Sequence, residues 1–316
     1  RPVRRVCMVD VEARGLPLSS ASKTSRITIL DGAMGTELRA RGATVPDYRS
    51  SAWSAMALVH DPDKVREVHS DYIAAGADII TANNYAVVPR LLARVGMADR
   101  LDELTRTACR LAREARAANA RPDVRIAGSL APLDTTYEAD LVAAEDELYE
   151  SYLRIARVLA GEVDLIMAET LTTVREAVAA ARAAASCGMQ ILVSWNLRLD
   201  APLLRGGESL QEAIGALESF PVGGYLVNCV PTGLVQPALE LMRNCTDRPL
   251  GAYANSCEAA PDQAALDAHA AHILTPQQYV AASECWVAAG ATLIGGCCDT
   301  DPAFIAALAK RWKQPG

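Results

Sequence analysis

The run Ala289-Gly290-Ala291-Thr292-Leu293-Ile294-Gly295-Gly296-Cys297-Cys298 decides the fold class. Gly290 is typical of a helix end, because glycine adopts the left-handed conformation that closes many helices without steric cost. The apolar residues after it are continuous rather than alternating, as in a strand covered on both faces of a parallel sheet. The run Ala75-Gly76-Ala77-Asp78-Ile79-Ile80-Thr81 repeats this order. The chain is therefore built from helix–glycine–strand units.

The same alternation extends along most of the chain. Strands are predicted at residues 27–30, 78–81, 124–127, 164–168, 191–195, 224–227, 250–253 and 292–294. Helices are predicted at residues 62–75, 100–119, 143–160, 173–185, 209–218, 235–244, 276–289 and 302–311. Eight alternating pairs in a chain of 316 residues are typical of an α/β protein with a single-domain (β/α)8 TIM barrel. A doubly wound open sheet has the same alternation and is the alternative.

The residues between these elements support the assignment of helices and strands. Three helices are predicted to begin with a capping side chain followed by proline, at Asp61-Pro62, Thr275-Pro276 and Asp301-Pro302. Two connections are long, at residues 32–61 and 255–275, and loops of this length usually have a functional role. The second loop contains His269 and His272, whose spacing makes them a weak candidate for a metal-binding pair.

Composition excludes several classes of function. Acidic residues outnumber basic residues by 38 to 31, which gives a net charge of −7. With this balance and no basic stripe, we expect no binding to nucleic acid. No apolar run has the length of a membrane span, so we expect no membrane partner. Nine cysteines without a short-range pairing pattern indicate a reducing compartment, the cytoplasm, with thiols that are free or bound to metal.

Residues 1–25 stand outside the predicted barrel, which we expect over residues 26–312. The segment is basic, has no periodic apolar pattern and lacks the long apolar core of a secretion signal. The chain begins with Arg1 rather than Met. We therefore expect an N-terminal extension that is poorly ordered or left over from cloning.

Polar and metal-capable side chains follow the predicted strands. Barrel enzymes carry their chemistry at the carboxyl ends of the strands, where these residues would gather. They are Asp31, Gly32, Met34, Gly35, Asn83, Asn84, Tyr85, Ser129, Glu169, Thr170, Asn196, Asn228, Cys229, Asn255, Cys297 and Cys298. Loops are polar in any protein, so the individual Asn and Ser residues carry little weight.

Three of these residues are cysteines. Cys229 ends the sixth predicted strand, and Cys297 and Cys298 follow the eighth. Buried cysteines often have no role, but three at strand ends suit a zinc ion with one open position, as in catalytic zinc sites. Successive strand residues point to opposite faces, so both vicinal cysteines reach one ion only if the chain bends. Gly295 and Gly296 are expected to allow that bend.

The ligand type restricts the chemistry of such a site. Three thiolates give a zinc site a net charge of −1 and weaken the ion as a Lewis acid, which disfavours hydrolysis. A substrate thiol could take the fourth position and be held as thiolate below its ordinary pKa of about 8.5. The natural reaction is alkyl transfer to sulfur.

Two carboxylates and several aromatic residues complete the predicted site. Asp31 could simply cap the turn at Gly32, but Glu169 is a charge at the end of an apolar strand, where an unpaired charge is costly. Together the two acids could hold a substrate ammonium. Trp53, Tyr85 and Trp195 lie in or beside the predicted mouth, where they either pack loops on the barrel or face a cationic methyl donor.

The chain resembles the zinc-dependent homocysteine S-methyltransferases from about residue 29 to residue 308. The matching runs are Leu30-Asp31-Gly32-Ala33-Met34-Gly35-Thr36-Glu37-Leu38, Trp53-Ser54-Ala55, His69-x-Asp71-Tyr72 with the run 75–81, Ala168-Glu169-Thr170, Val227-Asn228-Cys229, Gly251-Ala252-Tyr253-Ala254-Asn255 and the run 289–298. One motif alone would be weak, but the set is specific. The resemblance implies the same barrel fold.

The resemblance also implies roles for individual residues. It makes Cys229, Cys297 and Cys298 the zinc ligands and the catalytic centre. Asp31 and Glu169 match the residues that hold the amino group of homocysteine. The remaining substrate-binding candidates are Tyr85, which matches a tyrosine that can occupy the fourth zinc position in betaine-using members, Trp53, a donor-side aromatic residue, and Gly32 and Asn228.

The chain departs from the family pattern at Asp299, where the family usually has glycine. A carboxylate there could alter the loop or add negative charge near the donor. We also expect neither the C-terminal extension of the betaine enzymes nor a cobalamin or folate module, so a donor that acts through cobalamin is not expected.

The sequence thus predicts a cytoplasmic enzyme that methylates the thiolate of L-homocysteine to give methionine. The expected donors are S-methylmethionine, then S-adenosylmethionine, then betaine, and the expected partners are small molecules, in a monomer or weak homo-oligomer. Alternatives are another thiol or selenol acceptor, or a non-catalytic zinc-binding or redox-sensing barrel. A barrel aldolase would need a Schiff-base lysine, and none stands at the eight predicted strand ends.

Overall fold

A computed structural model describes residues 26–47, 49, 51–134, 136–258 and 272–313. Eight parallel strands form one sheet in the order β1-β8-β7-β6-β5-β4-β3-β2. They are β1 (Thr28–Ile29), β2 (Ile79–Thr81), β3 (Arg125–Leu130), β4 (Leu165–Leu171), β5 (Ile191–Trp195), β6 (Val222–Asn228), β7 (Leu250–Ala254) and β8 (Ala291–Gly296). The bridge between Leu30 and Ile79 joins the two ends of the sheet. The sheet is therefore a TIM barrel, and the open doubly wound alternative is wrong.

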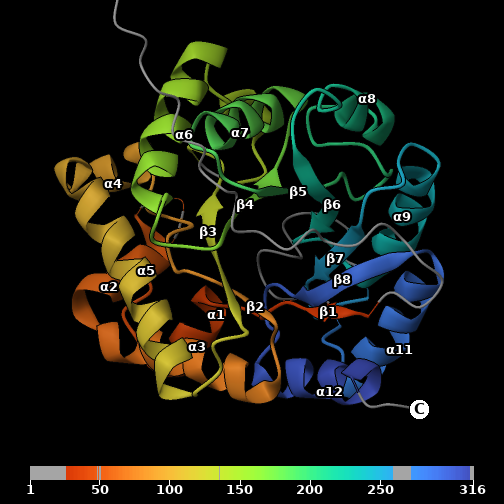
Figure 1. Ribbon diagram of the computed structural model, residues 1–316, viewed down its shortest axis with the longest axis horizontal. Coiled ribbons are helices and arrows are strands. Elements are labelled where there is room, and N and C mark those ends of the chain that lie inside the picture. Colours follow the sequence, from red (N-terminus) through yellow and green to blue (C-terminus); the bar gives the residue numbers. More distant parts are fainter. Residues whose placement is uncertain (1–25, 48, 50, 135, 259–271, 314–316) are drawn as a thin grey trace, which may run out of the picture.

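Helices surround the barrel (Figure 1). They are α1 (Gly35–Ala40), α2 (Met56–His60), α3 (Pro62–Ala75), α4 (Pro89–Arg94), α5 (Leu101–Ala118), α6 (Glu145–Leu159), α7 (Val174–Ser186), α8 (Leu210–Gly215), α9 (Val235–Arg243), α11 (Pro276–Ala288) and α12 (Pro302–Lys313). Short 3-10 turns lie at η1 (Trp53–Ala55), η2 (Ala98–Arg100), η3 (Ala139–Leu141) and η4 (Thr232–Leu234). The eight predicted helices are present with small shifts at their ends. Helices α1, α2 and α4, which lie in connections, were not predicted.

Helix starts and ends follow mostly from local chemistry. Thr275 forms a capping box with Gln278 at the start of α11. Asp61 does not cap α3, because its carboxylate accepts the Thr44 amide hydrogen bond at 2.9 Å instead. At the other end of α3, Gly76 has a φ of 107°, the left-handed conformation that was expected.

Two layers of apolar side chains hold the barrel together. One layer lies between the sheet and the helices and contains most of the buried residues. The other fills the barrel interior with Leu30, Ile79, Ala127, Leu165, Met167, Leu192, Leu226, Tyr253 and Leu293. The strands are buried on both faces, which explains their continuous apolar sequences.

An ion pair secures the amino-terminal edge of the barrel. The carboxylate of Asp78 accepts the Ile29 amide hydrogen bond at 2.8 Å and contacts Lys313 Nζ at 2.6 Å. Lys313 Nζ also donates to the carbonyl of Gly76 at 2.6 Å. The last residue of α12 thus ties the helix to the seam between β1 and β2.

Two predictions fall outside the part of the chain that the structure describes. These are the N-terminal extension, residues 1–25, and His269 of the histidine pair. Within the described part, none of the helices combines the length and the apolar character that a bilayer span requires.

Candidate active site

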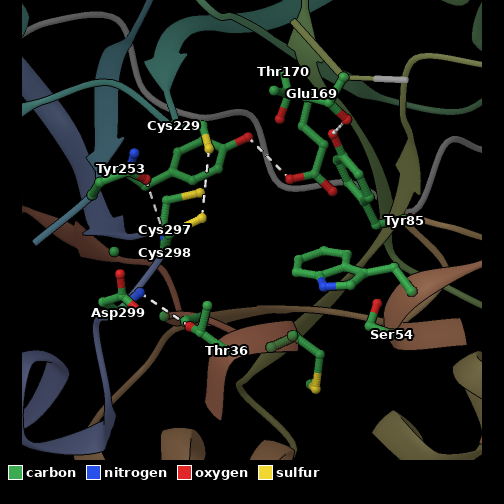
Figure 2. A pocket seen from close by; sticks show the side chains of 18 of the residues that line it. Thr36, Ser54, Tyr85, Glu169, Thr170, Cys229, Tyr253, Cys297, Cys298 and Asp299 are labelled. Atoms are coloured by element: carbon green, nitrogen blue, oxygen red, sulfur yellow. Dashed lines mark hydrogen bonds between the residues drawn. The ribbon is translucent and has the colours of Figure 1, made fainter. Parts of the chain in front are cut away.

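A cavity of about 280 Å³ opens at the carboxyl ends of the strands. Its wall includes eight of the predicted site residues, namely Asp31, Gly32, Trp53, Tyr85, Glu169, Cys229, Cys297 and Cys298. Figure 2 shows the three cysteines grouped on one side, with Glu169 and Tyr85 across the cavity from them. Residues that are far apart in the sequence therefore meet at the edge where barrel chemistry takes place.

The three sulfur atoms have the spacing of ligands to a single metal ion. They lie within 4.8 Å of one another, and the Sγ atoms of Cys229 and Cys298 are 3.7 Å apart. Tetrahedral ligands with zinc–sulfur bonds of about 2.3 Å would be about 3.8 Å apart. A disulfide would need about 2.05 Å. Cys229 is buried and the other two are half-buried, so an open coordination position would face the cavity.

The backbone conformation and hydrogen bonds of the three cysteines orient their sulfur atoms. Cys229 has a φ of 55°, a left-handed conformation that turns the chain directly after β6. Strand β8 ends at Gly296, and the Cys297 amide donates to the Ala254 carbonyl at 2.8 Å. The Cys298 amide donates to the Asn255 side chain at 3.1 Å. Each cysteine is thus anchored through its backbone to a neighbouring strand end.

Gly295 and Gly296 have a different role from the one predicted. Neither Gly295 nor Gly296 has a positive φ. A Cβ on Gly295 would instead lie 2.5 Å from the Cβ of Leu30, and one on Gly296 would clash with the side chain of Thr300. These glycines are required for close packing of β8 against its neighbours rather than for backbone freedom.

The carboxylates of Asp31 and Glu169 are buried away from solvent. Burial, partly offset by the Thr81 amide at 2.7 Å from the carboxylate, raises the pKa of Asp31 to about 8. Burial also raises the pKa of Glu169 to about 7, and Tyr253 contacts its carboxylate at 3.4 Å. Glu169 further raises the Asp31 pKa by charge repulsion. A cation bound between the two acids would relieve this cost.

Trp53 and Tyr85 form an aromatic corner of the cavity. Their ring centroids lie 6.0 Å apart at an interplanar angle of 76°. Gly35 lies against the indole, where any Cβ would overlap the ring. The Tyr85 hydroxyl is 2.7 Å from the Thr136 hydroxyl, so this tyrosine contacts a threonine rather than a sulfur atom.

Asn228, expected to contact substrate, has another position. It is fully buried and is not among the residues of the cavity wall. Its amide oxygen accepts hydrogen bonds from the Thr170 amide and the Ser194 hydroxyl at 2.9 and 2.7 Å, and its amide group donates to Thr170 Oγ1 at 2.8 Å. Asn228 therefore braces the ends of β4, β5 and β6 below the site. We now assign it a positioning role.

Two tyrosines that the sequence did not single out approach the site. Tyr253 on β7 contacts Glu169, and the Tyr137 hydroxyl lies 2.8 Å from Cys229 Sγ. Hydrogen bonds from Cys297, Cys298 and Tyr137 lower the pKa of the Cys229 thiol well below its ordinary value. Tyr253 stands in a run already matched to the family, but Tyr137 lies in a loop whose path the sequence pattern does not reveal.

Asp299 stands where the family resemblance predicts glycine, and its backbone has a conformation that glycine favours. Its φ is 60°, a left-handed conformation that glycine adopts freely and aspartate tolerates better than most residues. The Asp299 amide donates to Thr36 Oγ1 at 3.0 Å, as Figure 2 shows, and its carbonyl accepts from Ser256 at 2.9 Å. Asp299 is therefore held in this conformation as part of the cavity wall.

The model of the family "Homocysteine S-methyltransferase" matches residues 28–312, nearly the whole described chain. The chain belongs to this family. Homocysteine S-methyltransferase of Escherichia coli (strain K12) is 33% identical over 312 residues, which cover 93% of this chain and 98% of the relative. Homocysteine S-methyltransferase 4 of Zea mays is 30% identical, covering 96% and 94%.

Solved structures agree with this assignment. The homocysteine methyltransferase MmuM from Escherichia coli in its metallated form superposes with a TM-score of 0.78 at 30% identity, covering 92% of this chain and 97% of that one. The family resemblance predicted from the motifs and the barrel fold are thereby confirmed. The chain is an enzyme of the methyltransferase class.

Proposed function

We propose that this methyltransferase uses a zinc ion to transfer a methyl group from a small onium donor to the thiolate of L-homocysteine, giving methionine. The proposal rests on one observation: three sulfur atoms and two buried carboxylates with raised pKa values line the same cavity. The first group suits a thiophilic metal ion, and the second suits the ammonium of an amino acid. Homocysteine has both a thiol and an ammonium.

The sulfur donor set supports zinc. Three cysteines with tetrahedral spacing match its preferred ligands, and the relative from Escherichia coli is known in a metallated form. When bound, zinc would hold the homocysteine sulfur as a thiolate near neutral pH. Because the ligands are three thiolates, that sulfur would keep the electron density that a nucleophile needs.

The chain's own residues would position the reactants. Asp31 and Glu169 would bind the homocysteine ammonium and fix the direction of its sulfur. The aromatic corner of Trp53 and Tyr85 would face the positive charge of the donor. The sulfur attacks the donor methyl carbon in line, the bond from that carbon to the onium atom breaks, and a neutral product leaves. Proximity in a water-poor cavity supplies the rate, without a covalent enzyme intermediate.

Charged side chains in the cavity wall favour a donor with an amino-acid group. Arg39 and Asp47 line the cavity, and S-methylmethionine has a carboxylate and an ammonium in addition to its sulfonium. S-adenosylmethionine has the same groups on a larger molecule, whereas the one ammonium of betaine is the group that donates the methyl. We therefore rank S-methylmethionine first, S-adenosylmethionine next and betaine third. The thiols of the described cysteines are all free, which supports a reducing compartment such as the cytoplasm.

Metal analysis with a donor panel tests the proposal. We expect about one zinc ion per chain and methylation of homocysteine by at least one of the three donors. Cys298→Ser should lose the metal and lower kcat/KM at least about 1,000-fold, because it removes a ligand. Cys285→Ser is the matched control, since Cys285 lies on α11, exposed to solvent, and should change neither quantity.

Two outcomes would contradict the proposal. If Cys298→Ser keeps both its zinc and its activity, the three sulfur atoms are not the catalytic site. If zinc is bound but none of the donors methylates homocysteine or another thiol, the protein is a metal-binding or redox-sensing member of the fold.

A further inference from the structure

Tyr137 stands at the metal-binding sulfur atoms without a role in the function proposed above. It lies in the connection between β3 and α6, and its hydroxyl is 2.8 Å from Cys229 Sγ. Its backbone has a φ of 75°, a conformation that costs free energy in a residue other than glycine. Such strain persists only where surrounding contacts hold the residue in place.

We propose that Tyr137 is a positioning residue that donates a hydrogen bond to the sulfur of Cys229 and thereby sets the electron density of the metal site. This inference rests on the proposed function, because it needs Cys229 to be a metal ligand. A thiolate bound to a metal has lone pairs but no proton, so the hydroxyl must be the donor in this contact.

The distance between Tyr137 and Cys229 fits a hydrogen bond. If the Tyr137 oxygen were a fourth ligand, bonds of about 2.0 Å to oxygen and about 2.3 Å to sulfur would place it about 3.5 Å from Cys229 Sγ. The 2.8 Å between the Tyr137 oxygen and Cys229 Sγ is shorter and is the length of a hydrogen-bond contact. With Tyr137 hydrogen-bonded in this way, the fourth position would be available for the substrate sulfur.

Arg205 supports the hydrogen bond between Tyr137 and Cys229. Its guanidinium lies 5.3 Å from the centre of the Tyr137 ring, where a positive charge makes the phenol a better hydrogen-bond donor. Arg205 Nε also donates to the Asn196 side chain at 2.6 Å, and Asn196 donates to the Cys229 carbonyl at 2.7 Å. One arginine thus orders both the donor and the cysteine that accepts.

The chemical consequence concerns the substrate sulfur. A hydrogen bond withdraws electron density from the Cys229 thiolate, so the ion attracts its other ligands more strongly. Outer contacts of this kind commonly change metal affinity 10- to 100-fold. Tyr137 would therefore help the site to hold homocysteine without occupying a coordination position.

Replacing the metal with Co²⁺ allows the hydrogen bond between Tyr137 and Cys229 to be followed by absorption spectroscopy. Co²⁺ bound to thiolates has a sulfur-to-metal charge-transfer band whose energy reports the electron density on sulfur. In the Co²⁺ protein, Tyr137→Phe should move this band to lower energy, because the Cys229 sulfur regains electron density when the hydrogen bond is lost. Incorporation of 3-fluorotyrosine at Tyr137, a stronger donor of similar shape, should move the band to higher energy and covers the case in which the Phe variant does not fold.

Tyr149→Phe is the control. It removes a tyrosine hydroxyl on α6 that contacts the Ser186 hydroxyl at 3.3 Å and is not in the cavity wall, so the band should match that of the wild type. The inference is overturned if both Tyr137 replacements leave the band unchanged, or if Tyr149→Phe produces the same shift. A wild-type protein that binds no Co²⁺ would refute the metal site itself, whereas a bound ion with an unshifted band refutes the role of Tyr137 alone.

Discussion

At the scale of single residues, the two buried acids are the most costly feature of the site. Asp31 is only 8% exposed, and the charge of a second carboxylate, Glu169, raises its pKa further. A protein keeps such a pair only where another requirement outweighs the loss of stability. In the proposed function the substrate ammonium would meet that requirement, because a cation between the acids lowers the cost of ionising both.

The acids make stability depend on pH in an unusual direction. The pKa of Asp31 is about 8 in the folded protein and 3.8 in the unfolded chain, so between these values the folded protein binds more protons. The free energy of unfolding should therefore fall as the pH rises from about 4 to about 8. Asp31→Asn, which keeps an oxygen for the Thr81 amide, should remove much of this slope and add on the order of 3 kcal/mol at pH 8.

Urea unfolding at pH 5, 6, 7 and 8 without substrate measures this effect. The same variant should show a KM for homocysteine at least about 10-fold higher, since it loses a charge that binds ammonium. An Asp31→Asn protein with the pH slope of the wild type would show that Asp31 is ionised in the folded state.

The sequence pattern predicts best the residues near strand ends. Cys229 and Cys297 follow β6 and β8 by one position, and Glu169 lies near the end of β4, so the barrel alone determines where they gather. Tyr137 comes seven positions after the end of β3, and its place depends on a turn that no periodicity encodes. Asn228 was a candidate from the family resemblance alone, and in the structure its side chain is buried and is not in the cavity wall.

At the scale of elements, the strands were predictable because they are buried on both faces. A short continuous apolar run bounded by glycine is seldom anything other than a buried strand. Each of the eight predicted strands is present. The short helices α1, α2 and α4 escaped prediction because they are only five or six residues long. Helices of this length are stabilised by packing on the barrel rather than by their own sequence.

The junction of β8 with β1 is closely packed. At Gly295, a Cβ would lie 2.5 Å from the Cβ of Leu30 and 2.9 Å from the carbonyl oxygen of Asp31. Gly295→Ala should therefore lower the free energy of unfolding by about 2 kcal/mol and displace Asp31, which raises the KM for homocysteine. Urea unfolding and steady-state kinetics measure the two effects.

Gly215→Ala provides the comparison for this change. Gly215 is the last residue of α8, and a Cβ there would meet no atom within 4 Å. The substitution should leave stability unchanged or raise it by up to about 1 kcal/mol. If Gly295→Ala is equally harmless, the close packing of Gly295 against Leu30 is contradicted.

At the scale of the whole molecule, chemistry and stability occupy opposite ends of the barrel. The cavity lies at the carboxyl edge, whereas Asp78 and Lys313 close the amino-terminal edge. Division of this kind is general among TIM barrels. Changes at the closing ion pair should therefore alter stability without altering catalysis.

Lys313→Ala tests this division. It removes an ion pair whose two side chains are 19% and 16% exposed, along with a hydrogen bond to Gly76. We expect a loss of about 2 kcal/mol in the free energy of unfolding, with kcat and KM unchanged below the melting range. Arg311→Ala on the same helix breaks an exposed pair with Glu284 and should cost less than about 1 kcal/mol. A fall in kcat for Lys313→Ala at low temperature would refute the separation.

The wide spacing of the cysteines along the chain has a consequence for the order of folding events. Cys229 and Cys298 are 69 positions apart, and β8 pairs with both β7 and β1. In an unfolded chain, a loop of this size seldom brings its ends together. If the three cysteines hold a metal ion as proposed, the ligand set would be complete only after the last strand has docked. The ion would then contribute a slower rate of unfolding rather than a faster rate of folding.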